Sequence, residues 1–550
     1  MSQKRPNFLI IIADDLGFSD TSPYGSEINT PALDALAREG LRMTNFHTAS
    51  ACSPTRSMLF SGTDNHIAGL GCMWEHMQMH KDYFKGQPGY EGYLNHRVAA
   101  LPEILSDGGY FTVLSGKWHL GLTKEFAPVS RGFKNFSFLP GPGNHYAYGL
   151  QLEDTDGWFC ALCTDGHWME GDKFLDHKKD LPKDFFSTVS FTDKLLDFFN
   201  ARLEEGKEQP FFAYLPFTAA HWPLQASQER IAKYASMYDD GPDVLTQRRL
   251  AKLQDLGLAH RDAKAPPPIT RVMTPEWNHL SVDEKKRSAK TMEIYAAMVE
   301  QIDENIGRVV EYLKESKELD NTFILFMSDN GAEGAAMEAL PIMGGPKMMA
   351  NIVEKYYDNS TENLGNKDSF IWYGPRWANA GTAPSRGVKG TTFEGGIRCP
   401  CIVRFPPLQP QAGSISNTFV TVMDILPTVL ELAGLENPGK TYRGREVALP
   451  RGKSWVPHLA SKRADDVSIH GEATHIHGWE LFGHRAIRQG NWKAVWDPKL
   501  ENERWQLFNL AEDPSEQSDV ADTNSEVSDK LVLFWDQYVA ETGMIPSPSF

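Results

Sequence analysis

The sequence lacks several features that would assign it to common classes of protein. It holds no run of about 18 apolar residues, which a membrane-spanning helix would need. It has no long basic segment and a formal net charge of −17, so we expect no nucleic-acid partner. Cysteine is scarce, with six residues in 550, which is too few for a disulfide framework. The CxxC pair at Cys160 and Cys163 has no second pair of that spacing for a zinc site, so we interpret these cysteines as reduced thiols.

The N-terminus lacks the pattern of a secretory signal. Its apolar run extends only from Phe8 to Ile12, and Asp14 and Asp15 follow almost directly. A signal peptide needs about 7–15 apolar residues and a cleavage site of small residues. We therefore expect a cytoplasmic protein without membrane partners.

What the sequence does contain is typical of an α/β protein with two domains. A chain of 550 residues is too long for one ordinary core. Short apolar runs, typical of buried strands, alternate with helical patterns such as that of residues 293–314. We expect residues 1–434 to form a large mixed, mostly parallel sheet flanked by helices. The predicted strands are Asn7–Ala13, Tyr110–Leu114, Pro210–Phe217, Thr322–Ser328 and Cys399–Phe405.

Residues 435–550 show a different pattern. Ala486–Trp496 and Trp505–Leu510 are predicted strands, and the turn at Gly490-Asn491 divides the first of them. A helix over Ser528–Glu541 closes the chain. This order predicts a smaller C-terminal α+β domain with an antiparallel sheet.

Polar residues follow four of the predicted strands. Because ligands bind at the carboxyl ends of strands in open α/β sheets, we expect these residues to lie close together. They are Asp14 and Asp15, Lys117 and His119, His221, and Asp329 and Asn330. Several residues near these positions could line an apolar pocket for an aryl group or simply pack in the core: Met73, Trp74, Trp118, Trp222 and Tyr373.

Asp14, Asp15, Asp329 and Asn330 offer hard oxygen ligands from two strand ends. Either pair alone could be a turn or a helix cap, but together they indicate a metal site. Ca²⁺ takes six to eight such oxygens in flexible geometry. The absence of His and Cys from both pairs argues against zinc.

Cys52 stands just before a predicted helix. Ser53 could cap a helix that starts at Pro54, which would place the thiol at a helix N-terminus, where anions are favoured. The thiol there could be a nucleophile of lowered pKa or an ordinary buried cysteine. The residues alone leave both interpretations open.

The segment Cys52-Ser53-Pro54-Thr55-Arg56 matches the Cys/Ser-x-Pro-x-Arg signature of sulfatases. Gly116–His119 and Asp329–Gly331 follow in the family's order, and the chain resembles the type I, formylglycine-dependent sulfatases over nearly its whole length. It is most similar to the cytosolic arylsulfatases of proteobacteria. The resemblance implies an alkaline-phosphatase-like fold and the hydrolysis of sulfate monoesters. It also implies that a maturation enzyme oxidises Cys52 to formylglycine (3-oxoalanine).

The resemblance assigns a role to each site residue. One Ca²⁺ per chain would be bound by Asp14, Asp15, Asp329 and Asn330. Arg56 would hold one hydroxyl of the hydrated formylglycine, and His119 would be the base that expels sulfate and restores the aldehyde. The sulfate oxygens would be contacted by Lys117, His221 and Lys389. His221 or Lys389 would protonate the leaving oxygen.

Three alternatives to a sulfatase fit the sequence less well. Phosphonate monoester and phosphodiester hydrolases of the same superfamily typically carry Asp-His where this chain has Asp329-Asn330. A zinc phosphatase would need more Asp and His ligands and a Ser or Thr nucleophile. A catalytically inactive calcium-binding protein predicts broken motifs, whereas every motif is intact. The partners we expect are a small sulfate ester and the maturation enzyme, and we expect a monomer.

Overall fold

The structure is a computed structural model. It describes residues 4–155, 166–204, 209–269, 274–334, 346–408, 410–463, 466–471, 473–498 and 504–548. Cys160 and Cys163, the predicted free thiols of the CxxC pair, lie outside these residues. Within the described ranges, no helix has the length and hydropathy needed to cross a bilayer.

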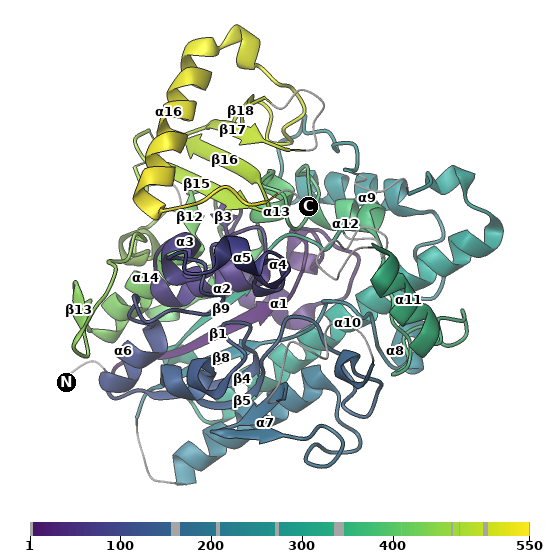
Figure 1. The fold of residues 1–550 in the computed structure, drawn as a ribbon, viewed down its shortest axis with the longest axis horizontal. Coiled ribbons are helices and arrows are strands. Elements are labelled where there is room, and N and C mark those ends of the chain that lie inside the picture. The colour runs from purple at the N-terminus through teal and green to yellow at the C-terminus, as the bar shows by residue number, and fades with distance from the viewer. Residues whose placement is uncertain are drawn as a thin grey trace.

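A mixed sheet of ten strands, counted over the described residues, forms the centre of the larger body (Figure 1). Neighbours β9, β1, β8, β4 and β5 run parallel, whereas β10 lies antiparallel to β9 and to β2. In spatial order the strands are β11 (Ile415–Ser416), β2 (Leu41–Met43), β10 (Cys401–Arg404), β9 (Thr322–Ser328), β1 (Asn7–Ala13), β8 (Phe211–Pro216), β4 (Phe111–Lys117), β5 (Lys134–Phe138), β6 (Trp168–Glu170) and β7 (Lys173–Leu175). The predicted mostly parallel sheet is confirmed, and the predicted strand at Cys399–Phe405, which is β10, runs antiparallel to both of its neighbours.

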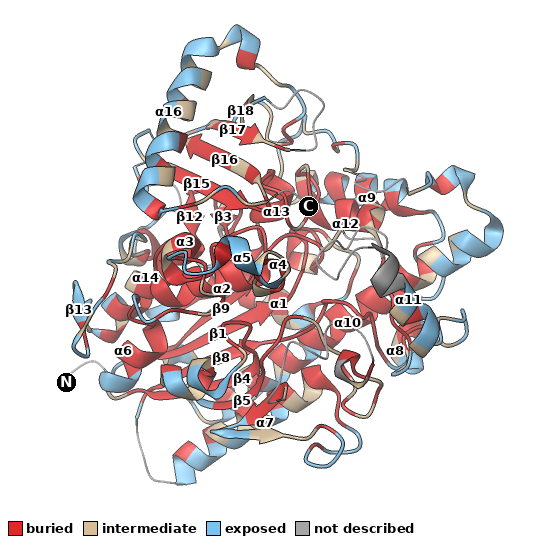
Figure 2. Cartoon of the chain, in the orientation of Figure 1, coloured by how far each residue is buried: buried red, intermediate tan, exposed pale blue. Residues whose placement is uncertain are grey.

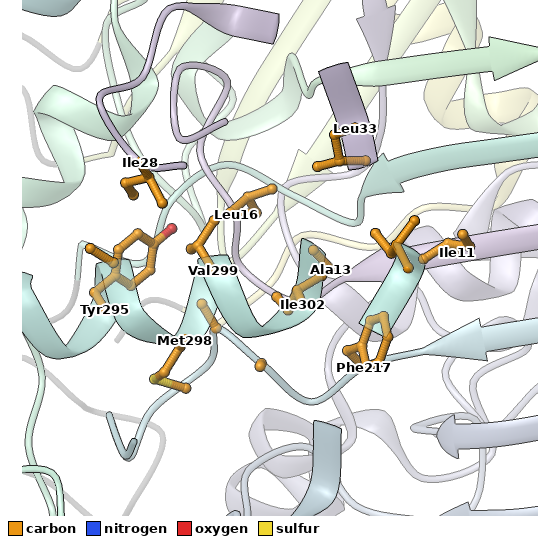
Figure 3. Packing of buried hydrophobic residues seen from close by; sticks show 14 of the residues in the cluster. Ile11, Ala13, Leu16, Ile28, Leu33, Phe217, Tyr295, Met298, Val299 and Ile302 are labelled. Atoms are coloured by element: carbon orange, nitrogen blue, oxygen red, sulfur yellow. The ribbon is translucent and has the colours of Figure 1, made fainter. Parts of the chain in front are cut away.

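Helices cover both faces of this sheet, which explains why its central strands are apolar on both sides. Along β1, Leu9 and Ile11 enter one core and Ile10 enters the other. The first core includes helices α1 (Pro31–Glu39), α7 (Ser187–Glu204) and α10 (Val282–Glu315). Figure 3 shows Ile302 of α10 beside Ala13 and Val299 of the same helix beside Leu16. The second core includes α2 (Cys52–Ser61), α6 (Leu101–Asp107) and α14 (Ile425–Ala433).

Shorter elements complete the body around the sheet. The remaining helices are α3 (Asn65–Ala68), α4 (Trp74–Met79), α5 (Lys81–Phe84), α8 (Gln228–Ala232), α9 (Pro242–Asp255), α11 (Pro346–Tyr356), α12 (Pro375–Thr382), α13 (Glu394–Ile397) and α15 (Val456–Leu459). Two small strand pairs are β3 (Phe46–His47) with β12 (Val420–Thr421) and β13 (Thr441–Tyr442) with β14 (Arg445–Glu446). Figure 2 shows burial concentrated in the central sheet and exposure along the outer helices.

The C-terminal part is an antiparallel sheet with one long helix, as predicted. Its strands are β15 (Ile476–Leu481), β16 (His484–Gln489), β17 (Trp492–Trp496) and β18 (Gln506–Asn509), and α16 (Ser525–Thr542) covers one face (Figure 1, yellow). Gly490 adopts φ 60° at the predicted turn between β16 and β17. The opposite face packs Ala486 and Val495 against Phe393 of the larger body. The boundary at residue 434 stays a prediction, and Trp455 and Leu459 beyond it pack in the second core.

Two local predictions about helix and strand ends are wrong. Helix α2 begins at Cys52 with extended Ala51 as its N-cap, so Ser53 lies inside the helix and does not cap it. Strand β4 continues through Lys117 instead of ending at Leu114, because it pairs with β5 as far as Phe138. Both changes bring functional side chains into rigid elements.

Candidate active site

The parallel strands β1, β4, β8 and β9 bring their polar ends to one edge of the sheet. All ten residues predicted for the site meet there, and nearly all are buried. Those on or just after strands are Asp14, Asp15, Lys117, His119, His221, Asp329 and Asn330. Those from other segments are Cys52 and Arg56 of α2 and Lys389 of the loop before α13.

The four oxygen-bearing residues form one buried group. The Asp15 backbone N–H donates to Asp329 Oδ1 at 3.2 Å, and Asn330 Nδ2 donates to Asp15 Oδ1 at 2.8 Å. Asp14 Oδ1 and Asn330 Oδ1 are buried without a hydrogen-bond partner among the described residues. Burial raises the pKa of Asp14 well above its ordinary value, and Lys117 partly opposes this. Two buried oxygens that accept no hydrogen bond from the described residues, in a group of four residues without sulfur, fit a hard divalent cation.

Three basic side chains surround this acidic group. Lys117 Nζ lies 2.6 Å from Asp14 Oδ2, and Lys389 Nζ lies 2.8 Å from the Asp15 carboxylate. Arg56 donates from Nε and Nη2 to Asp329 Oδ2 at 3.0 and 2.8 Å. Burial alone would lower the pKa of Lys117, but Asp14 raises it above its ordinary value. These cations provide the local positive charge that an anionic substrate needs in a chain of net negative charge.

Cys52 is the first residue of α2 and points toward this group. Its Sγ lies 3.2 Å from His119 Nδ1, and its side chain is fully buried. Burial raises the pKa of the Cys52 thiol above its ordinary value. Because the thiolate is the nucleophilic form, the unmodified cysteine is a weak nucleophile here.

His119 is held from both ring nitrogens. Nδ1 faces Cys52, and Nε2 lies 3.2 Å from Glu75 Oε1. Its backbone N–H donates to Leu139 O at 2.9 Å, and its φ of 58° is left-handed. Burial lowers the pKa of His119 below its ordinary value, although Glu75 opposes this. The sequence predicted no role for Glu75, since no motif marks it.

His221 approaches the site from the segment after β8. Its Nδ1 donates to Trp222 O at 2.7 Å, so Nε2 is the ring nitrogen that faces Asp15 Oδ2 at 3.4 Å. Burial, followed by Lys389 and Lys117, lowers the pKa of His221 well below its ordinary value.

Glu333 is a second residue that the sequence did not single out. Its Oε2 lies 3.1 Å from Lys389 Nζ and accepts from Trp222 Nε1 at 3.4 Å. Together with Asp15, it holds the Lys389 ammonium beside His221. The one hint in the sequence is its position two residues after the Asp329–Gly331 motif.

The candidate aromatic residues fall into two groups. Trp118 packs in the core against Phe60 and Phe133. It is fully buried, so it does not line an open pocket. Trp222 lies beside His221 and belongs to an apolar cluster with Phe370 and Trp372. This cluster is mostly buried, with Trp372 partly exposed, and it adjoins the charged site through Trp222.

Comparisons with known proteins identify the family of this chain. A family model described as Sulfatase matches residues 6–435, and one described as N-sulphoglucosamine sulphohydrolase, C-terminal, matches residues 388–533. An uncharacterized sulfatase of Schizosaccharomyces pombe is 53% identical, covering 99% of this chain and 95% of its own. The arylsulfatase of Klebsiella aerogenes is 36% identical, covering 81% of this chain and 90% of its own.

A solved structure, the phosphonate monoester hydrolase of Agrobacterium radiobacter, shares the fold. It superposes with a TM-score of 0.56 at 18% identity, covering 98% of this chain and 96% of that chain. At this identity the likeness concerns the alkaline-phosphatase-like fold alone.

Proposed function

The chain belongs to the sulfatase family, and we propose that it is an arylsulfatase that uses a formylglycine made from Cys52 and a bound Ca²⁺. The observation that carries this proposal is the position of Cys52. Its Sγ lies at the start of α2, 3.2 Å from His119 Nδ1, beside a buried group of three carboxylates and one amide.

The residues present fit both a bound Ca²⁺ and a formylglycine at position 52. Asp14 Oδ1 and Asn330 Oδ1, which accept no hydrogen bond from the described part of the chain, would together with Asp15 and Asp329 hold Ca²⁺, which supplies charge neutralisation for a bound anion. Formylglycine at position 52 would supply, as its hydrate, a nucleophilic hydroxyl and a second hydroxyl through which the aldehyde is recovered.

The basic residues bind and orient the sulfate group. Lys117 and Lys389 would contact its oxygens, with Lys389 kept in place by Asp15 and Glu333. Arg56 is fixed by Asp329 and by the carbonyl of Lys117, to which Nη1 donates at 2.9 Å. It would hold a hydroxyl at position 52. Preorganised charge of this kind, shielded from water, stabilises a developing negative charge.

Two histidines handle the protons. His119 Nδ1 would accept a proton at position 52, where it already lies 3.2 Å from the side chain. Lys389 Nζ, or His221 once it is protonated at Nε2, would give a proton to the oxygen of the leaving alcohol. His145 holds the backbone of His221 in place, because its Nε2 donates to His221 O at 3.1 Å.

An aryl sulfate is the substrate class that the surroundings favour. Trp222 beside His221 and the partly exposed Trp372, both packed on the buried Phe370, would provide the apolar contact for a leaving phenol. The Klebsiella relative carries the name arylsulfatase. We further propose a monomeric, cytoplasmic enzyme that depends on a formylglycine-generating enzyme for its maturation.

Turnover of 4-nitrophenyl sulfate tests the proposal. The protein is co-expressed with a formylglycine-generating enzyme, and Cys52→Ala is compared with Cys72→Ala, another fully buried free thiol. We expect Cys52→Ala to lower kcat by about 10³-fold or more, since removing a nucleophile removes its reaction path. Cys72→Ala should keep its activity. An active Cys52→Ala enzyme, or wild type that hydrolyses 4-nitrophenyl phosphate but not the sulfate, contradicts the proposal.

A further inference from the structure

We propose that Glu75 is a positioning residue that sets the orientation and tautomer of His119, so that Nδ1 presents its lone pair to position 52. This inference rests on the proposed function and extends it. It assigns a role to a carboxylate that the sequence motifs leave out.

The geometry gives each ring nitrogen of His119 one partner. Nδ1 lies 3.2 Å from Cys52 Sγ, and Nε2 lies 3.2 Å from Glu75 Oε1. A neutral imidazole has one donor and one acceptor nitrogen, whereas an ionised carboxylate only accepts. The Nε2 atom therefore carries the proton toward Glu75, and the lone pair of Nδ1 faces position 52. A buried Asp performs the same task for the histidine of serine hydrolase triads.

The surroundings of Glu75 favour this role over a structural one. Glu75 is buried on the short helix α4, with 4% of its surface exposed, so its charge must be compensated locally. Its Oε2 has no hydrogen-bond partner among the described residues. A carboxylate used only for packing elements together would pair both oxygens. This one directs Oε1 to the catalytic imidazole.

The space around the imidazole is fitted to the His119–Glu75 pair. A Cβ at Gly141 would lie 2.8 Å from His119 Cε1, 3.0 Å from Nε2 and 3.2 Å from Glu75 Oε1. The φ of Gly141 lies outside the left-handed region, so alanine can adopt the backbone there. Glycine is therefore needed at this position for the room it leaves to the pair.

Three variants on this pair separate positioning from folding. Glu75→Leu removes the acceptor, Glu75→Gln keeps a carbonyl oxygen that can accept from Nε2, and Gly141→Ala displaces the pair without removing any polar group. Gln78→Leu is the matched control, because it places the same new side chain on an exposed position of the same helix.

The kinetic expectation is a loss in kcat with little change in KM. Glu75→Leu should lower kcat for 4-nitrophenyl sulfate by about 10²–10⁴-fold, the contribution typical of a positioned base, and KM should stay within about threefold because Lys117 and Lys389 are untouched. Gly141→Ala should also lower kcat with little change in KM. Glu75→Gln should retain more activity than Glu75→Leu, and Gln78→Leu should match wild type.

Crystal structures of the unmatured Cys52 proteins give a readout that is independent of activity. In wild type, His119 Nδ1 should face Cys52 Sγ, whereas in Glu75→Leu and Gly141→Ala the ring should turn or shift away. A folded Glu75→Leu protein with an unmoved ring, or with kcat within threefold of wild type, overturns the inference. If the ring moves as expected but matured wild type hydrolyses no aryl sulfate, the positioning role stands and the proposed function fails.

Discussion

Two residues of the site, Asp15 and His119, adopt left-handed backbone conformations with φ of 64° and 58°. Side chains other than glycine rarely occupy this region, and the cost is on the order of 1–3 kcal/mol for each residue. Each residue follows the end of a central strand, where the bend turns its side chain into the site. Asp15 N–H is held by Asp329 and His119 N–H by Leu139. The surrounding structure thus maintains conformations that isolated peptides would avoid.

At the same scale, the oxygen ligands predict how the enzyme responds to metal removal. Chelation with EDTA should abolish turnover, and Ca²⁺ should restore it better than Zn²⁺, because Asp14, Asp15, Asp329 and Asn330 offer only oxygen. Asn330→Ala removes a buried oxygen that accepts no hydrogen bond from the residues that the structure describes. It should raise the Ca²⁺ concentration for half-maximal activity by about tenfold or more. Activity titrations with each metal measure the metal preference and the half-maximal Ca²⁺ concentration, and calorimetry measures Ca²⁺ binding directly. Full turnover in the thoroughly chelated protein would contradict a metal at this site.

At the scale of elements, the ends of strands were the most predictable feature. The apolar run of β1 is buried on both faces, and its polar residues begin where the strand ends, because a buried strand cannot carry unpaired charges along its length. The same reasoning located Asp329 and His221. For Lys117 the same reasoning predicts a position after the strand, whereas Lys117 is the last residue of β4. The strand extends that far because it pairs with β5, and this pairing cannot be read from the local sequence.

The direction of strand β10 and the existence of strand β15 could not be predicted. Strand β10 lies antiparallel to β9, yet its apolar pattern is the same as that of a parallel buried strand. Strand β15, with the sequence Ile476-His477-Gly478-Trp479-Glu480-Leu481, was not predicted at all. Some of its polar residues are buried against the larger body, as Glu480 is against His66. The strand therefore lacks the alternation of apolar and polar residues by which strands are predicted.

Helix α2 shows how a small shift in an element changes the chemistry at one residue. The Cys/Ser-x-Pro-x-Arg motif located Cys52 and Arg56 correctly in the site, but the helix begins at Cys52 itself. Position 52 therefore lies in the first turn, where the helix dipole stabilises negative charge by about 0.3–1 kcal/mol. Glu75 could not be found this way, because its partner His119 is 44 residues distant in the chain.

At the scale of the whole molecule, the C-terminal sheet supports the loop that carries Lys389. Lys493 of β17 pairs with Glu394 and Glu516 at 2.8 and 2.9 Å, and all three are buried. Arg386, three residues before Lys389, donates to Glu516 O at 3.0 Å. The two parts of the chain therefore share a buried ionic network next to the site.

A second junction between the two parts predicts a pH dependence of stability. His66 of α3 lies 2.7 Å from Asp64 and 3.1 Å from Glu480 of β15. Burial acts to lower its pKa, but Asp64 and Glu480 raise it from 6.5 to about 9. The stabilisation is complete below pH 6.5 and is lost as pH rises through 9, and it amounts to about 3 kcal/mol.

Urea unfolding at pH 6.5 and pH 9.5 measures this loss, with His66→Gln as the control because glutamine has a similar shape but does not titrate. Wild type should lose about 3 kcal/mol more than the variant over this range. Identical pH dependence in the two proteins would show that His66 is not charged in the folded state.

The central claim, that position 52 carries a formylglycine, is tested most directly by the mass of the tryptic peptide Met43–Arg56. When the protein is co-expressed with a formylglycine-generating enzyme, this peptide should be about 18 Da lighter than the cysteine form, and the lighter fraction should rise in proportion to aryl sulfate turnover. A peptide that keeps the full cysteine mass in a preparation that hydrolyses aryl sulfate would contradict the account.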